Sequence, residues 1–154
     1  MTEPAFDIAK AHQHFSADCF NRTWGFIDKA DRTPEEAEQM LLLALASLWH
    51  WTQREDRTDQ NLSVGYWLVS RAQALCGRGE EARRYGQLAL EAAQQGDADA
   101  FTSGYAYEAL ARAASISGTS DKMGEYLVQA RKAAEQVEDE ESKSWLLDDL
   151  KTIG

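Results

Sequence analysis

The stretch YWLVSRAQALCG, residues 66–77, returns further along the chain as YEALARAASISG, residues 107–118. The two copies share a tyrosine, an arginine, an alanine and the closing glycine: Tyr66, Arg71, Ala72 and Gly77 align with Tyr107, Arg112, Ala113 and Gly118, and 118 − 77 = 41. The residues that follow keep this register, since Tyr85 aligns with Tyr126 and Ala89 with Ala130. Agreement over a helix, its glycine stop and the next helix predicts tandem helix-turn-helix units.

A third unit is predicted upstream of these two. Its second helix matches the later one in two short segments, because Glu35-Glu36-Ala37 and Leu43-Ala44-Leu45 align with Glu80-Glu81-Ala82 and Leu88-Ala89-Leu90. The shift here is 82 − 37 = 45 residues. We therefore expect three hairpins in series.

Helix start and stop signals divide the chain into seven predicted helices. Thr33-Pro34-Glu35-Glu36 combines an N-cap threonine, proline at the first helical position and glutamate three residues after the cap. No window alternates convincingly with period two, and β-branched residues are sparse, so no sheet is expected. The predicted helices cover residues 4–30, 34–55, 59–76, 79–95, 98–117, 120–137 and 140–152. Their short connections make successive helices antiparallel neighbours.

The second of these helices contains an uncharged run, MLLLALASLWHW, at residues 40–51. Twelve residues are too few to span a bilayer, which takes about 20, so the run predicts a buried helix. At 100° per residue, one face packs within the stack: Ala37, Leu41, Ala44, Leu45, Leu48 and Trp51. Leu43, Ala46 and His50 point elsewhere and need either the N-terminal turns of the first helix or another molecule. They are the predicted interface of a homodimer.

The repeat resembles the tetratricopeptide repeat (TPR) family over roughly residues 14–137. The first helix of that repeat carries an aromatic, then a large and a small apolar position, here Tyr66, Val69 and Ser70, and then Tyr107, Leu110 and Ala111. The spacing is 41 or 45 residues rather than the family's 34, and no proline closes a unit. The resemblance implies an all-α solenoid of three antiparallel hairpins at about residues 4–55, 59–95 and 98–137, in one domain of residues 1–154.

Residues 140–152 are the expected capping helix of this stack. Leu146, Leu147 and Leu150 are predicted to cover the last hairpin, while Asp148 and Asp149 face water. An exposed apolar end is a liability in repeat proteins, so a terminal cap with a polar outer face is the expected solution.

The resemblance also implies a concave groove lined by the first helix of each unit. The groove positions fall on Arg22, Phe26, Lys29, Val64, Trp67, Arg71, Tyr105, Glu108 and Arg112. A strip of basic and aromatic side chains would suit an extended peptide, acidic or ending in a carboxylate. The alternative is that Arg71 and Arg112 form salt bridges inside the scaffold.

Charge and composition restrict the partner. The chain has 16 basic and 26 acidic residues, for a formal net charge of -10, which argues against nucleic acid and against an anionic membrane surface. The N-terminal MTEPAFDIAK lacks the pattern of a signal peptide. With Cys19 and Cys76 alone, no disulfide framework is predicted, and we expect a cytoplasmic protein with two buried thiols.

Sequence motifs for catalysis, cofactors or metals are lacking. His12 and His14 stand two residues apart and so point to different sides of a helix, while His14 and Asp18 supply only two ligands. No nucleophile or second acid is tied to His50 by spacing. We therefore predict a non-catalytic module that binds a protein or peptide, with no cofactor and no metal. The alternatives are a self-assembling structural protein or an enzyme whose pocket gathers residues far apart in sequence.

Overall fold

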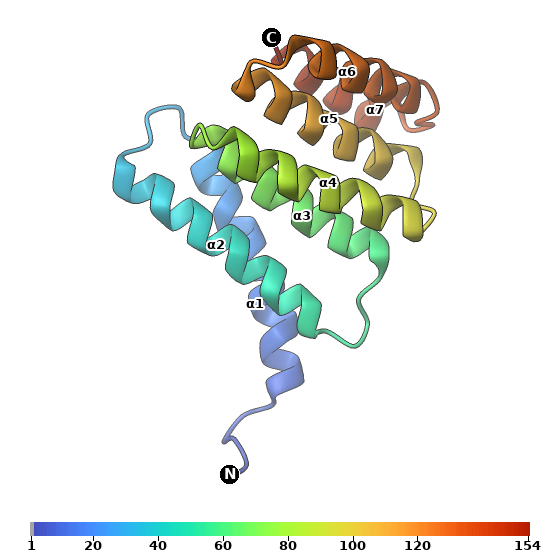
Figure 1. Cartoon of the computed structure of the whole chain (residues 1–154). Coiled ribbons are helices and arrows are strands. Elements are labelled where there is room, and N and C mark those ends of the chain that lie inside the picture. The colour runs from blue at the N-terminus through green and yellow to red at the C-terminus, as the bar shows by residue number, and fades with distance from the viewer. Residues whose placement is uncertain (1) are drawn as a thin grey trace. The chain divides into compact units, whose positions relative to one another are not determined.

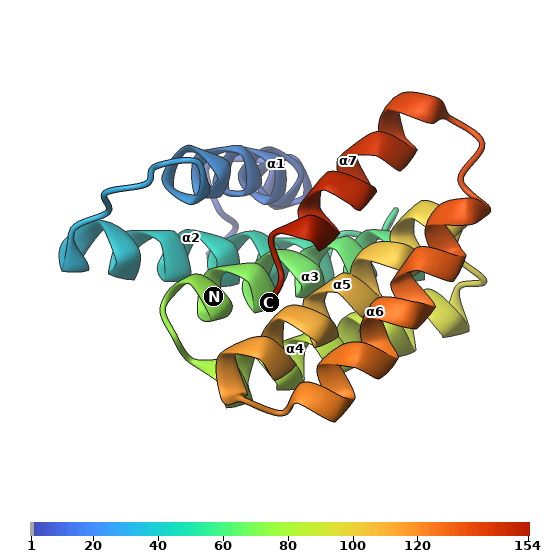
Figure 2. The same ribbon diagram turned by 90° about the horizontal axis from the view of Figure 1, so that it is seen from above.

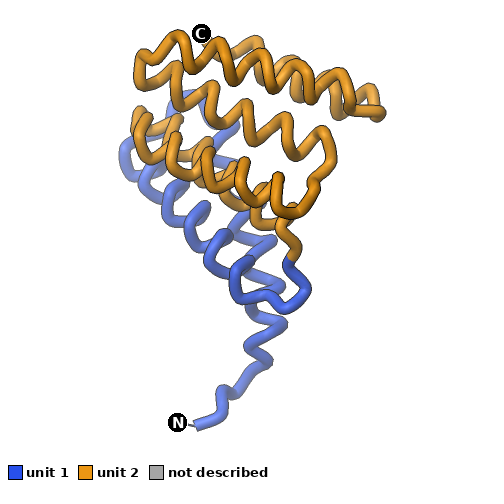
Figure 3. The backbone as a smooth tube through the Cα atoms, turned by 45° about the vertical axis from the view of Figure 1, so that its right-hand side comes forward, with its two compact units in different colours: residues 1–57 blue, residues 58–154 orange. Residues whose placement is uncertain are grey.

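The computed structural model describes residues 2–154, which form seven α-helices and contain no strand. The all-α prediction is therefore confirmed. The chain divides into two compact units, residues 1–57 and residues 58–154 (Figure 3). This boundary lies between the first and the second predicted hairpin.

Unit 1 is one helical hairpin, α1 (Ile8–Ile27) and α2 (Pro34–Gln53). The prediction that the first helix starts at residue 4 is wrong by one turn, because the side chain of Asp7 caps the helix by accepting from the Lys10 backbone N–H at 3.0 Å. The predicted capping box of α2 is present between Thr33 and Glu36. Both starts follow from a side-chain oxygen that satisfies otherwise unpaired N–H groups.

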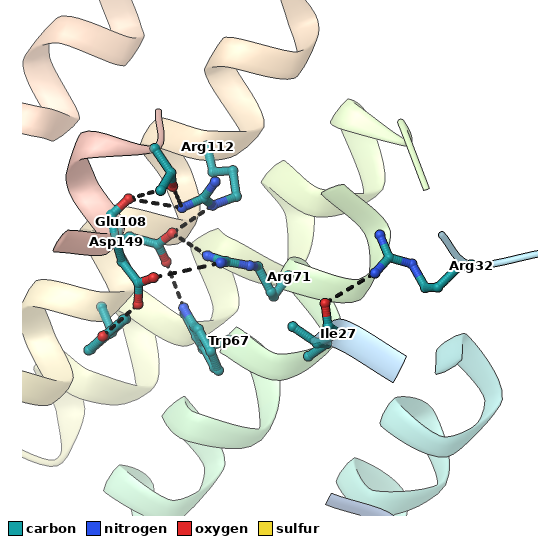
Figure 4. Close-up of polar contacts among 9 residues, drawn as sticks. Ile27, Arg32, Trp67, Arg71, Glu108, Arg112 and Asp149 are labelled. Atoms are coloured by element: carbon teal, nitrogen blue, oxygen red, sulfur yellow. Dashed lines mark hydrogen bonds and ion pairs between the residues drawn. The ribbon is translucent and has the colours of Figure 1, made fainter. Parts of the chain in front are cut away.

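Arg32 closes the other end of α1. Its Nη1 donates to the carbonyl oxygens of Phe26 and Ile27 at 2.9 and 3.1 Å, and also to that of Lys29. Figure 4 shows the bond to Ile27. The last carbonyls of a helix have no partner within the helix, so a guanidinium that collects them holds the turn between α1 and α2.

The two helices of unit 1 meet through small polar groups on α1. Ser16, Cys19 and Thr23 are the buried residues of α1, and the Ser47 hydroxyl of α2 donates to the Ser16 carbonyl at 2.8 Å. Leu43 is only 9% exposed and lies four residues before Ser47, on the same side of the helix. Leu43 is therefore buried on the side of α2 that packs against α1, and packing against the first helix is one of the two ways in which the sequence was expected to cover it.

Unit 2 contains five helices: α3 (Asp59–Leu75), α4 (Gly79–Gln95), α5 (Ala100–Ser117), α6 (Ser120–Glu135) and α7 (Glu140–Lys151). α3 pairs with α4, and α5 pairs with α6, as antiparallel hairpins (Figure 1). α5 also packs against both helices of the preceding hairpin, and α7 packs against both α5 and α6 (Figure 2). The boundaries match the sequence prediction to within two residues.

Close helix contacts in unit 2 depend on small residues. On α3, the Ser63 hydroxyl donates to the Ala89 carbonyl of α4 at 2.7 Å, and the Ser70 hydroxyl donates to the Ala82 carbonyl of α4 at 2.7 Å. At Gly104 of α5, a Cβ atom would lie 2.5 Å from Cδ2 of Leu146 on α7. Leu146 is fully buried in a core cluster shared by α5, α6 and α7. Hence α7 is seated on the last hairpin through its leucines.

No helix of residues 2–154 has the length and apolar character needed to cross a bilayer. Cys19 is buried and Cys76 is partly exposed, so the prediction of two buried thiols is confirmed for Cys19 and wrong for Cys76. Burial raises the pKa of the Cys19 thiol above its ordinary value, which keeps it protonated.

Candidate functional site: a buried ion cluster in unit 2

Glu108 of α5 is the centre of a hydrogen-bonded ion cluster in unit 2. Its side chain is fully buried, with an exposed fraction of 0%. Oε2 accepts from the indole Nε1 of Trp67 at 2.8 Å, and Oε1 accepts from Arg71 Nη1 at 2.9 Å and from Arg112 Nε at 2.7 Å (Figure 4). A buried carboxylate is tolerated because three donors, two of them charged, replace its water.

The two arginines are held differently. Arg112, four residues after Glu108 on the same helix, also donates through Nη2 to the Asp149 carbonyl at 3.2 Å and to Thr152 Oγ1 at 2.8 Å. Arg71 of α3 has its Nη2 3.8 Å from Asp149 Oδ1, which is beyond hydrogen-bond distance. Its buried Nε has no acceptor among residues 2–154. Arg71 therefore keeps unused donor capacity, whereas Arg112 is tied to α5 and α7.

Asp149 of α7 completes the cluster. Its Oδ2 accepts from the Tyr105 hydroxyl at 2.7 Å, and its side chain remains 32% exposed. Burial, reinforced by this hydrogen bond to Asp149, raises the pKa of Tyr105 far above its ordinary value, so the phenol stays neutral. The sequence prediction that Asp149 faces water is therefore wrong, because its carboxylate turns towards Tyr105 and Arg71.

The charges of the cluster balance. Two guanidinium groups, Arg71 and Arg112, stand against two carboxylates, Glu108 and Asp149. The arginine side chains are only 13% and 14% exposed. The charges of Arg71 and Arg112, expected from the sequence to form a basic strip, are thus balanced by carboxylates of the same chain. Their contacts are those of the alternative prediction, in which the two arginines form salt bridges inside the scaffold.

Aromatic rings border the cluster. Trp67 is buried, and its ring meets that of Tyr105 edge to face with centroids 5.4 Å apart. Phe101, one turn earlier on α5, packs against Tyr105 in the same manner at 5.0 Å. Val64, one turn before Trp67 on α3, is 37% exposed. Trp67 and Phe101 therefore pack on Tyr105 and form an apolar margin with it beside the partly exposed Asp149, and Val64 continues the exposed surface of α3 one turn from Trp67.

The cluster follows the repeat register into α7. Trp67, Glu108 and Asp149 are equally spaced, since 108 − 67 = 41 and 149 − 108 = 41. They lie at the same spacing on α3, α5 and α7; Trp67 bonds Glu108 directly, and Arg71 and Tyr105 connect this pair to Asp149. Sequence reasoning missed Asp149 and Thr152 because it ended the repeat before α7. The equal spacing was the signal that could have found Asp149.

Two of the groove residues predicted in unit 1 form ion pairs within their own hairpin. Arg22 is exposed and lies 3.7 Å from Asp18, one turn earlier on α1. Lys29 pairs with Glu36, which raises the pKa of the lysine and lowers that of the glutamate. Phe26 is half-buried. In unit 1, Arg22 and Lys29 therefore pair with local acids on the surface of the hairpin.

The predicted interface residues of α2 divide into different environments. Leu43 is buried, Ala46 is partly exposed, and His50 is covered by the N-terminal half of α1. Nδ1 of His50 lies 2.9 Å from Nδ1 of His12, and the His50 ring lies 5.5 Å from that of Phe15. Burial, with a smaller contribution from His12, lowers the pKa of His50. The sequence left two possibilities for covering His50, the N-terminal turns of the first helix or another molecule. The structure shows the first helix.

Within residues 2–154, no group of three or more His, Cys, Asp or Glu side chains is arranged to hold a metal ion. Comparison with protein-family models, with curated proteins and with solved structures finds no match to this chain. The assignment of function therefore depends on the geometry of the chain itself.

Proposed function

We propose that this chain is a non-catalytic, TPR-like module that binds a protein or peptide along the face shared by α3, α5 and α7. One observation carries the proposal: Trp67, Glu108 and Asp149, at the same repeat position in three helices, meet in one cluster. Helices whose equivalent positions converge present one continuous surface, which is how stacked hairpins form a binding face.

The packing of unit 2 supports the same proposal. α5 packs against both α3 and α4, and α7 packs against both α5 and α6. In a solenoid every repeat contacts only its neighbours in this manner, and the first helices of the repeats line one side.

On this face, the buried arginines serve chiefly to hold the helices in register. A ligand would contact the exposed margin, in particular Val64 and the half-exposed side of the cluster. Arg71 is the group that would receive an acidic or C-terminal carboxylate, through its Nη2, which lies 3.8 Å from Asp149 Oδ1 and so beyond hydrogen-bond distance of it. A ligand carboxylate would there add a partner without displacing Glu108.

The test compares two peptide libraries of identical sequence, one with free C-terminal carboxylates and one amidated, for binding to the whole chain. We expect ligands in the carboxylate library and at least about tenfold weaker binding of their amidated forms. No ligand in either library would refute a peptide-binding groove, and equal binding of both forms would remove Arg71 as the receptor.

Two matched variants locate the binding face. Val64→Glu places a negative charge on the margin of the cluster, while Val128→Glu makes the same change at a 48% exposed site on α6. We expect the first variant to lose ligand affinity, the second to keep it, and both to keep the melting temperature of the wild type. Equal loss in both would place the ligand elsewhere.

A further inference from the structure

One side of α2 carries a row of exposed or partly exposed side chains, of which Trp49 also contacts the His12 ring of α1. Leu42, Leu45 and Trp49 are 51%, 37% and 55% exposed. Glu35 and Glu38 precede them on the same face, and Thr52 follows. We call these six residues the α2 seam; it lies on a different side of the helix from Ser47 and His50, which contact α1.

The spacing of the seam fits a partner that is itself a helix. Its members, at positions 35, 38, 42, 45, 49 and 52, are separated alternately by three and four residues. This is the a and d spacing of helices that pair side by side. An extended peptide or a flat surface has no need for such a row.

The seam is complementary to a second copy of itself running in the opposite direction. If a two-fold axis passes between residues 43 and 44, each position of one helix lies opposite the position of the other helix whose number makes the sum 87. The opposed pairs are 42 with 45, 38 with 49, and 35 with 52. Leu42 then meets the partner's Leu45. Glu35 meets the partner's Thr52 and Glu38 meets the partner's Trp49, so that no carboxylate of the seam faces another.

A parallel pair would have the opposite property. Glu35 and Glu38 would each lie against their own copies, and like charges at facing positions are destabilising. The antiparallel pair also places the N-terminus of one α2, where the helix dipole is positive, beside the C-terminus of the other. The charges of the seam thus favour one orientation.

The aromatic end of the seam is already ordered. The Trp49 ring lies edge-on to the rings of His12 and His50, with centroids 5.4 and 5.0 Å apart. A large side chain held in place before association loses less conformational freedom when it is buried at an interface.

From this arrangement we propose that the α2 seam is the contact surface of an isologous homodimer in which two α2 helices pair antiparallel. The interface differs from the one expected from sequence, because Leu42, Leu45 and Trp49 take the place of Leu43, Ala46 and His50. It uses α2 alone and does not depend on the peptide-binding face of unit 2.

Sedimentation equilibrium of the whole chain tests the proposal. We expect wild type to be dimeric and Leu42→Glu to dissociate at least about tenfold more readily, because its carboxylate would be buried against the partner's Leu45. Val128→Glu, a matched change at an exposed apolar site on α6, should leave the dimer unchanged. A monomeric wild type, or Leu42→Glu that stays as dimeric as wild type, overturns the proposal. The proposal is also overturned if Leu42→Glu lowers the melting temperature but leaves the sedimenting mass of the wild type unchanged. Leu42 would then be covered by other residues of its own chain.

Thr52→Lys tests the orientation. In the antiparallel pair, each lysine would face the partner's Glu35, forming two equivalent ion pairs, and we expect dissociation about three- to fivefold weaker. In a parallel pair the two lysines would face each other and weaken association. Weaker association of Thr52→Lys at unchanged melting temperature would therefore overturn the antiparallel arrangement.

Discussion

Replacing Glu108 by glutamine should destabilise unit 2 by much more than its small change in shape suggests. Both oxygens of Glu108 accept hydrogen bonds, Oε2 from Trp67 and Oε1 from Arg71 and Arg112. Glutamine has one carbonyl oxygen, so its amide NH₂ must face a donor in either orientation. The substitution also leaves two buried guanidinium groups with Asp149 as the one remaining carboxylate of the cluster.

The expected loss follows from the burial. Removing one member of a buried charge pair costs about 3–5 kcal/mol, and because the glutamine oxygen keeps part of the bonding we expect about 3 kcal/mol. With a denaturant slope near 2 kcal/mol per molar, this lowers the urea midpoint by roughly 1.5 M. Circular dichroism during urea unfolding at pH 7 measures it.

Two further variants check the reasoning. Glu80→Gln removes a carboxylate that pairs with Arg83 at an exposed site, and the midpoint should stay where it is in wild type. Trp67→Phe removes the indole N–H, so the double variant Trp67→Phe, Glu108→Gln should be less unstable than the sum of the single variants, by about 1–2 kcal/mol. A loss below about 1 kcal/mol for Glu108→Gln, or an additive double variant, would refute the role given to the cluster.

Three further outcomes are expected. Gly104→Ala should cost about 1–3 kcal/mol in unfolding free energy, because the new methyl would lie 2.5 Å from a Leu146 carbon, whereas Gly124→Ala, with open space around it, should not destabilise the chain. Tyr105 has a folded-state pKa above the 10.0 of the free side chain, so the unfolded chain releases the proton first; unfolding free energy should fall as pH rises past 10.0, less steeply in Tyr105→Phe. His50 has a folded-state pKa below 6.5, so the unfolded chain binds the proton first; stability should fall as pH drops through 6.5, and a titration of thermal stability should be flatter in His50→Gln.

The helices could be read from the sequence because their signals are local. Thr33 with Glu36 starts α2, and Gly118, at φ 73°, ends α5 in a left-handed conformation that glycine adopts freely. The start of α1 was placed at residue 4, one turn too early, because the cap made by the Asp7 side chain was not recognised. Each of these outcomes depends on a few neighbouring residues.

The orientation of α2 could not be read in this way. Its central run is uncharged on every side, so periodicity does not distinguish the face that packs from the face that is exposed. The choice is made by α1, whose Ser16 carbonyl receives the Ser47 hydroxyl and whose His12 meets His50. The residues joined by these two contacts are 31 and 38 positions apart in the sequence, so a local pattern does not reveal them.

The candidate site was found in part. Trp67, Tyr105 and the two arginines were placed on one face by the repeat, and they do meet. The contacts of Trp67 and the two arginines with Glu108 were not foreseen. A helical wheel shows on which side of a helix a residue lies, but not whether a neighbouring helix buries it. A carboxylate that points towards a neighbouring helix is either a ligand contact or a buried counter-ion, and only the position of the next helix decides between them.

The single carboxylate shared by Arg71 and Arg112 has a consequence for how this chain could change length in evolution. Repeat proteins grow and shrink by duplicating whole units, which requires that any unit can follow any other. Here the position occupied by Trp67, Glu108 and Asp149 differs from helix to helix: an indole donor first, a buried acceptor second, a half-exposed carboxylate last. A second copy of α5 and α6 inserted before α7 would set a glutamate where Glu108 now finds an indole, and two buried carboxylates would face each other. The two hairpins of unit 2 and α7 are thus distinguishable parts that cannot be exchanged without changing the partners of Glu108.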